Sequence, residues 1–130
     1  MIRTIARITV ATALAVATIG VTPAFANDAD VIRRGNCSGA SDWKLKLSPE
    51  DGRIEVEYEV DQNKNGVQWR VRIFKEGVRI FRGTRTTQAP SGSFEVRVVT
   101  GNTTGDDSFT ARAVNLSSGE VCRGAATGSF

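Results

Sequence analysis

Arginine alternates with apolar residues in one stretch of the sequence, GVQWRVRIFKEGVRIFRGTR, which covers residues 66–85. The guanidinium group of arginine forms paired hydrogen bonds with carboxylates and phosphates, and it stacks on aromatic rings. Arginines beside exposed aromatic side chains are therefore typical of binding surfaces. The candidate binding face consists of Arg70, Arg72, Phe74, Arg79 and Phe81. Its chemistry suits an acidic peptide or an anionic sugar.

A tight turn at Glu76-Gly77 would bring these side chains onto one side of a hairpin. The expected cross-strand pairs are Phe74 with Arg79, Arg72 with Phe81, and Ile73 with Ile80. The alternative is a solvated sheet face, on which the arginines pack along their aromatic neighbours and nearby glutamates neutralise them. The sequence leaves both interpretations open.

The residues of the common catalytic sites are missing. The sequence has no histidine, which excludes Ser-His and Cys-His nucleophile pairs and histidine-based metal sites. Carboxylates remain, but Glu55, Glu57 and Glu59 alternate along the solvent side of a predicted strand. A glycosidase would need two carboxylates in a cleft. We therefore predict that the protein is not an enzyme and uses no cofactor.

The segment DQNKNG, Asp61 to Gly66, begins like a calcium-binding loop, with oxygen-bearing side chains at alternate positions. The pattern then fails, because the twelfth position is Arg72 instead of a bidentate glutamate. Lys64 also places a positive charge inside the loop. We expect a polar connection and no metal site.

The segment 83–92 follows the arginine-rich stretch and is long for a hairpin loop. It is expected to cross from one sheet to another, as a sandwich requires. The alternative is an exposed loop through which the protein inhibits a protease-type enzyme or acts as an effector.

The first 26 residues have the three-part pattern of a secretory signal peptide. Arg3 and Arg7 precede an uncharged apolar stretch from Ile8 to Val21, and Ala24-Phe25-Ala26 is a cleavage pattern. The apolar stretch is short for a membrane span, so none is expected after cleavage. Export also predicts a disulfide between Cys37 and Cys122, so neither would be a nucleophile.

Cleavage would change the charge of the chain. The full sequence has 17 Lys and Arg against 14 Asp and Glu, and the loss of two arginines leaves 15 against 14. A net charge of +1 does not favour nucleic acid as a partner. We divide the chain into a signal peptide (1–26), an N-terminal segment held by Cys37 (27–42) and a β-sandwich domain (43–126).

Period-two alternation recurs along the mature chain, and no segment keeps a helical period. It predicts about seven short strands separated by turn sequences, as in an antiparallel sandwich. In the first hairpin, folded around PEDG, the expected pairs are Leu47 with Ile54, Leu45 with Val56, Trp43 with Tyr58, Lys46 with Glu55 and Lys44 with Glu57. The strand 67–74 would either pair with 53–60 or cross to a second sheet. In the second case Arg97 is a candidate partner for the glutamates of 53–60.

Two stretches resemble immunoglobulin-like and fibronectin type III-like domains. Trp69, in VQWRVRIFKEGVRI, is similar to the buried tryptophan of the third strand in those folds. GDDSFTARAVNLSSGEVC resembles their last two strands, with Phe109 where a tyrosine is common. The predicted disulfide departs from their usual inter-sheet pair. The chain as a whole resembles small exported proteins of actinobacterial type.

The expected protein is therefore an all-β sandwich with one disulfide. Its expected role is that of a secreted, non-catalytic binding module. Its partner would be a protein or an envelope glycan.

Overall fold

The computed structural model describes residues 29–130. The predicted signal peptide, residues 1–26, lies outside this part. Residues 29–130 contain no helix that could serve as a membrane span. Their regular elements are eight strands, one more than predicted: β1 (Val31–Asn36), β2 (Asp42–Glu50), β3 (Arg53–Asp61), β4 (Gln68–Lys75), β5 (Val78–Thr86), β6 (Ser93–Gly101), β7 (Asp107–Asn115) and β8 (Val121–Gly128).

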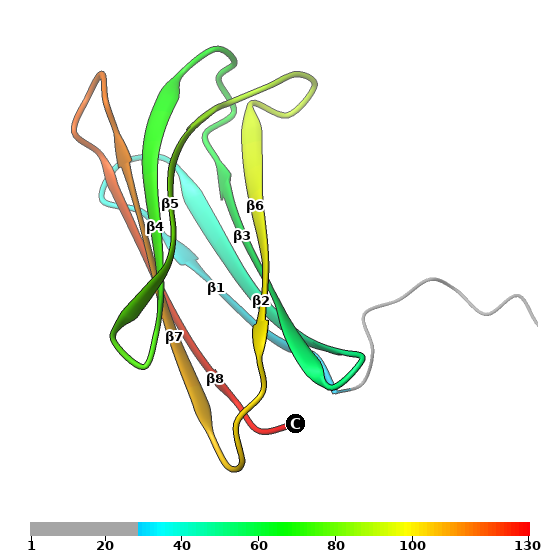
Figure 1. The fold of residues 1–130 in the computed structure, drawn as a ribbon. Coiled ribbons are helices and arrows are strands. Elements are labelled where there is room, and N and C mark those ends of the chain that lie inside the picture. Colours follow the sequence, from blue (N-terminus) through cyan, green and yellow to red (C-terminus); the bar gives the residue numbers. More distant parts are fainter. Residues whose placement is uncertain (1–28) are drawn as a thin grey trace, which may run out of the picture.

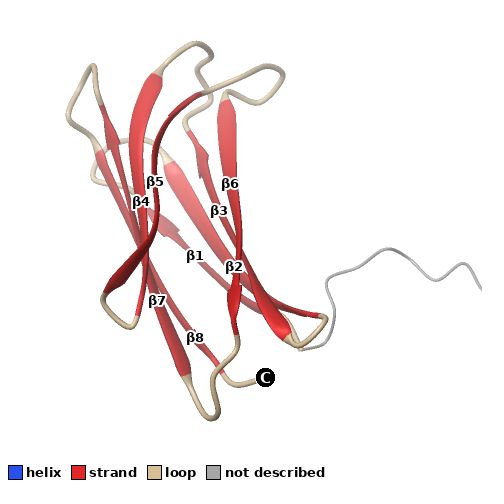
Figure 2. Ribbon diagram, viewed as in Figure 1, coloured by secondary structure: helices blue, strands red, loops and turns tan. Residues whose placement is uncertain are grey.

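The strands form two antiparallel sheets that pack face to face (Figures 1 and 2). One sheet has the order β1-β2-β3-β6, and we call it sheet A. The other has the order β5-β4-β7-β8, and we call it sheet B. The predicted all-β sandwich is confirmed, and its architecture is compatible with an immunoglobulin-like fold.

The core lies between the sheets and is built by the alternation seen in the sequence. The fully buried inner positions include Leu45, Leu47, Ile54, Val56, Tyr58 and Val60 from sheet A, and Trp69, Val71, Ile73 and Ala113 from sheet B. Trp69 packs against Phe94 of the opposite sheet, with ring centroids 6.1 Å apart. Each strand therefore turns every second side chain toward the facing sheet, which leaves the intervening side chains to form two outer faces.

The first hairpin has the predicted faces but a different register. The structure pairs Leu45 with Tyr58 and Lys46 with Glu57, a shift of two residues from the expected pairs. The reason is the tight turn at Asp51-Gly52, where both residues have positive φ, which allows the strands to continue to Glu50 and Arg53. A shift of two keeps every side chain on its face, so apolar residues still meet apolar ones.

Strand β4 belongs to the second sheet and does not pair with β3. The connection after β3 crosses to sheet B, and β3 pairs with β6 instead of β4. The predicted partner of the β3 glutamates is confirmed, because Arg97 Nη2 lies 2.8 Å from Glu55 Oε2. The connection after β5 crosses back from sheet B to sheet A, as expected for the segment 83–92.

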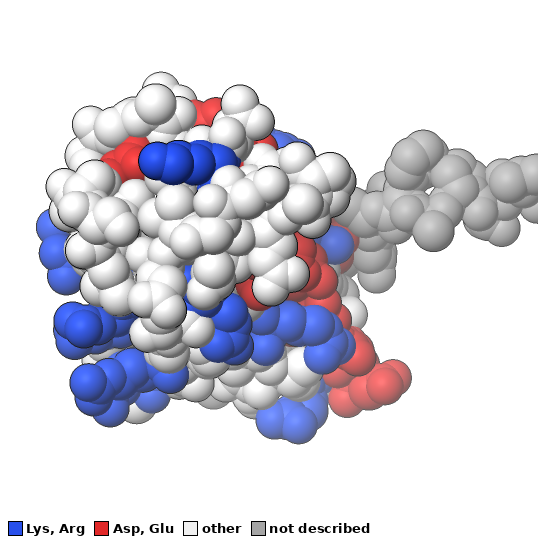
Figure 3. Space-filling view, turned by 90° about the horizontal axis from the view of Figure 1, so that it is seen from above, with Lys and Arg blue, Asp and Glu red and all other residues white. Residues whose placement is uncertain are grey.

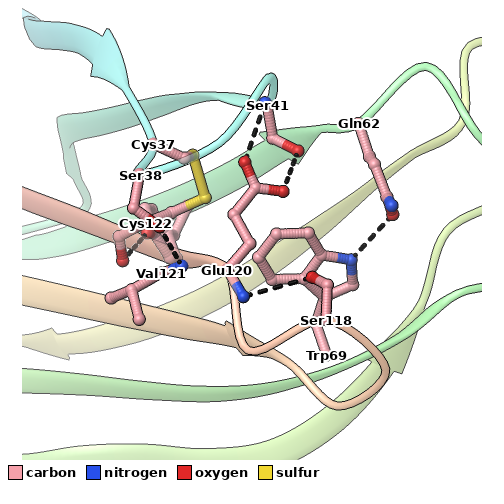
Figure 4. The surroundings of a disulfide bond; sticks show 10 residues. Cys37, Ser38, Ser41, Gln62, Trp69, Ser118, Glu120, Val121 and Cys122 are labelled. Carbon is pink, nitrogen blue, oxygen red and sulfur yellow. Dashed lines mark hydrogen bonds between the residues drawn. A yellow bond between two sulfur atoms is a disulfide. The ribbon is translucent and has the colours of Figure 1, made fainter.

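The disulfide joins Cys37, just after β1, to Cys122 in β8 (Figure 4). It connects the β1 edge of sheet A to the β8 edge of sheet B. Hydrogen bonds between Ser38 and Val121 lie beside it, and the buried Tyr58 hydroxyl donates to the Cys122 carbonyl at 3.0 Å. The sandwich is thus closed covalently along one side.

An aromatic side chain fills the same side of the sandwich. Trp43 of β2 lies between Gly35 of β1 and Gly124 of β8. A Cβ atom on Gly35 would lie 2.7 Å from the indole ring, and one on Gly124 would lie 2.9 Å from it. The two glycines therefore provide the space in which the indole sits.

Candidate functional site

Four arginines form a row across the outer face of sheet B. Arg82 of β5 pairs with Arg72 of β4, Arg72 pairs with Arg112 of β7, and Arg112 pairs with Arg123 of β8. The neighbours of these residues along each strand point into the core, so all four side chains lie on the outer face. We call this set the arginine row.

A second row runs parallel to the arginine row, one outward position along the strands. It consists of Arg79, Phe74, Thr110 and Ala125, which are paired in that order across the sheet. The short side chains of Thr110 and Ala125 leave a hollow of about 600 Å³ beside the arginines. It is lined by the outward-facing Phe74, Thr110, Arg112, Arg123 and Ala125 together with Trp43, Ala111 and Gly124.

Arg70 extends the basic surface on the other side of the arginine row. It lies two residues before Arg72 on β4 and pairs with Val114 of β7. Arg70, Arg72, Arg112 and Val114 line a smaller hollow of about 190 Å³. The outer face of sheet B therefore carries six arginines around two hollows.

The structure corrects one member of the predicted binding face. A β-bulge between Ile73 and Phe74 shifts the hairpin, so that Ile73 pairs with Phe81 instead of Ile80. The pairing of Phe74 with Arg79 is as predicted, but Arg72 pairs with Arg82. Phe81 consequently lies on the inner side of β5, packed against the core, with the guanidinium of Arg85 5.0 Å from its ring centroid. The extra residue of a bulge reverses the faces of the strand beyond it.

The outer face of sheet B has no acidic partner for its arginines. None of the side chains that alternate outward on β4, β5, β7 and β8 is Asp or Glu. Within residues 29–130, none of the six arginines forms an ion pair or a side-chain hydrogen bond. The Nε atom of Arg72 is buried without a hydrogen-bond partner. Figure 3 shows basic side chains gathered on the left flank, the side of sheet B in Figure 1.

The outer face of sheet A differs, because its basic residues Lys46 and Arg97 form ion pairs, although Glu59 and Glu95 lie directly opposite one another. Arg97 contacts Glu50 at 2.9 Å and Glu55 at 2.8 Å. Lys46 lies 3.6 Å from Asp30 and 3.7 Å from Glu57. In Figure 3 acidic and basic side chains lie side by side on the right flank. Glutamates neutralise an arginine on the outer face of sheet A, as the alternative of a solvated face expected. These glutamates lie on the other sheet and do not contact the arginines of sheet B.

The glutamates of β3 influence one another strongly. A hydrogen bond with Glu55 is the main cause that raises the pKa of Glu57 to about 7, and burial and the charge of Glu95 add to it. Hydrogen bonds from Arg97 and from the neighbouring glutamates lower the pKa of Glu55 to about 2. The two glutamates therefore titrate far apart, and Glu57 takes up a proton at a much higher pH than Glu55 does.

The segment resembling a calcium loop is a hydrogen-bonded connection. The carboxylate of Asp61 accepts a bond from the Asn63 amide at 3.0 Å, and the Lys64 carbonyl accepts one from the Thr87 hydroxyl at 2.6 Å. Among residues 29–130 there is no cluster of three or more acidic or cysteine side chains that could hold a metal ion.

The segment 83–92 is largely structured. Residues 83–86 belong to β5, and only residues 87–92 form the crossover. The crossover is held by Thr87, whose backbone and hydroxyl both bond to the 64–67 region, and by a bond from Gln62 to Gly92. The exposed part is the short tip Gln88, Ala89, Pro90 and Ser91.

Sequence reasoning missed three of the arginines that the structure brings together, Arg82, Arg112 and Arg123. Each occupies a polar position in a strand where polar and apolar residues alternate, so the sequence predicted that its side chain faces outward. Their alignment with Arg72 depends on which strands are neighbours and on their register. Neither property follows from alternation alone.

Comparisons of the chain with family models, with curated proteins and with solved structures find no match. The function is therefore argued from the site itself, since a fold does not define a function.

Proposed function

We propose that this protein is a non-catalytic binding module that acts outside the cell and binds its partner with the outer face of sheet B. One observation carries the proposal: four arginines lie in direct register across four strands, without a carboxylate on that face. The partner is a negatively charged protein or envelope glycan.

The arginine row lowers the stability of the free protein. Like charges directly opposite one another on neighbouring strands are destabilising. A carboxylate on a neighbouring strand could relieve such repulsion, as it does around Arg97 of β6, which contacts Glu55 of β3 and Glu50 of β2. Residues that reduce stability without a compensating contact are characteristic of functional surfaces. An anionic partner would supply the missing contacts.

The chemistry of the rest of the chain supports a non-catalytic role. The sequence has no histidine, and both cysteines are in the disulfide. The disulfide and the predicted signal peptide support a location outside the cell, where disulfides persist. Inhibition through the segment 83–92 is supported less well, because four of its residues are part of β5.

Affinity capture tests the proposal. The purified protein, expressed as the full chain, is incubated with envelope and culture fluid of its source organism. We compare it with Arg72→Gln/Arg112→Gln and with a charge-matched control, Arg33→Gln/Arg53→Gln, whose arginines are exposed on sheet A.

We expect the native protein and the control to capture the same partner, and the sheet B variant to lose it. Capture by all three forms, or by none, would contradict the proposal.

A further inference from the structure

We infer that the partner of the outer face of sheet B is a linear polysaccharide of uronic acid units, which lies across the strands along the arginine row. This inference rests on the proposed function and specifies its ligand. One sugar ring occupies the hollow beside Phe74, and its carboxylate contacts Arg112 and Arg123.

The direction of the arginine row sets the shape of the ligand. Neighbouring strands lie about 4.8 Å apart, so the four Cα atoms span roughly 14 Å perpendicular to the strands. A single small anion could contact only one or two of these guanidinium groups. A polymer that repeats its carboxylate along its length can contact them in succession, each through the paired hydrogen bonds that arginine prefers.

The hollow beside the row fits a sugar ring. A volume of about 600 Å³ lies in the range of small-molecule sites. Phe74 and Ala125 provide an apolar floor for the C–H groups of a sugar, and the Thr110 hydroxyl can donate to or accept from a ring hydroxyl. Arg112 and Arg123 stand at the border between this floor and the arginine row.

One buried donor of the site, on Arg72, has no acceptor within residues 29–130. The Nε atom of Arg72 is buried and has no acceptor within the described residues. A buried donor without a partner is unfavourable, and a carboxylate could satisfy it once the Arg72 side chain turned toward the ligand. Carboxylates are acceptor-only groups when ionised, as the site requires.

Other polyanions fit the surface less well. The row crosses the middle of sheet B, where backbone groups are already paired, so an acidic peptide could not bind as an added strand. Single-stranded nucleic acid is bound by aromatic platforms that stack successive bases. Phe74 is the one aromatic side chain at the outward positions of β4, β5, β7 and β8, and Trp43, which also lines the hollow, is held between Gly35 and Gly124.

Calorimetric titration with polygalacturonate oligosaccharides tests the inference. The protein expressed as the full chain is titrated at about 0.15 M salt, where exposed charges are largely screened beyond ~8 Å. Dextran, polyglutamate and single-stranded DNA are titrated in parallel. The variants are Arg112→Gln/Arg123→Gln and the control Arg33→Gln/Arg53→Gln.

We expect saturable binding of polygalacturonate and none of dextran. The Arg112→Gln/Arg123→Gln variant should bind about tenfold or more weakly, whereas the control should change the affinity less than about twofold. Removing two repelling charges should leave the melting temperature of the variant unchanged or higher, so a loss of binding is separated from a loss of folding.

Three results would overturn the inference: no binding of polygalacturonate, equal binding of polyglutamate or DNA, or equal loss in the control variant. If affinity capture yields a protein that the sheet B variant loses, while polygalacturonate does not bind, the ligand class is wrong and the binding face stands. If capture is unaffected by the sheet B variant, the proposed function itself fails.

Discussion

The position of the Trp43 side chain depends on two glycines, which have no side chain of their own. Its indole occupies the space between Gly35 and Gly124, two residues from opposite sheets. Neither glycine has a positive φ, so the space that they leave, and not a special backbone conformation, explains why glycine occurs there.

Gly124→Ala should therefore lower the free energy of unfolding. The added methyl group would lie 2.9 Å from the indole ring, and overpacking of this kind costs about 1–3 kcal/mol. Urea unfolding followed by tryptophan fluorescence measures the change. Gly101→Ala is the matched control, because a Cβ there would have no neighbour within 4 Å. Equal stability of the Gly124 variant and wild type would show that the indole simply moves aside.

Strand β3 carries the clearest pH dependence at the scale of an element. The pKa of Glu57 is about 7 in the folded protein against an ordinary value of 4.5. The folded state therefore keeps a proton that the unfolded chain releases, and stability falls as the pH rises from about 4.5 to about 7. Glu55 has the opposite sign, since its stabilising charge is lost only as the pH falls toward 2.

Glu57→Gln should remove the first of these effects. The amide can keep a hydrogen bond to Glu55 at every pH, so the variant should melt a few degrees above wild type at pH 8 and close to it at pH 5. Thermal unfolding followed by circular dichroism at the two pH values measures the difference. Glu59→Gln is a charge-matched control on the same face. A parallel shift at both pH values would argue against a raised pKa of Glu57.

The sequence predicted which way most side chains point but not how the strands align. Alternation placed Leu45 and Tyr58 in the core, yet their pairing was predicted two residues out of register, because a shift of two preserves both faces. The bulge between Ile73 and Phe74 could not be predicted from the sequence, because it depends on the register in which β5 pairs with β4. It alone moved Phe81 from the predicted binding face to the inner side of the sheet.

Only part of the candidate site could be predicted, again because the sequence does not show which strands pair. Arg70, Arg72, Phe74 and Arg79 are close in sequence and were predicted together. Arg112 and Arg123 lie on β7 and β8. In sheet B, β7 pairs with β4, but along the chain β5, β6 and two crossings between the sheets separate them. A single sequence gives no signal for such pairing.

At the scale of the whole molecule, the disulfide limits how far the sheets can separate. Cys37 and Cys122 are 85 residues apart, so their bond closes most of the described chain into one loop. Closing a loop of this length stabilises a protein by roughly 4 kcal/mol in chain-entropy estimates.

The Cys37→Ala/Cys122→Ala variant should lose most of that stability while keeping its strands. Guanidinium unfolding of the variant, and of the wild type with its disulfide reduced, measures the loss, and the two midpoints should agree. An unchanged midpoint in the variant would mean that hydrogen bonds beside the disulfide, such as those between Ser38 and Val121, suffice to hold the edge.

The bulged strand β5 also has a consequence for how copies of this protein meet. β5 is an outer edge of sheet B, and a regular edge would offer its unpaired backbone groups to a strand from a second molecule. The register shift interrupts that pattern, and Arg79, Arg82 and Arg85 surround it with like charge. Two molecules approaching edge to edge would meet mismatched hydrogen bonds and mutual repulsion. The same hairpin that exposes arginines thus makes the β5 edge a poor template for a strand from a second molecule.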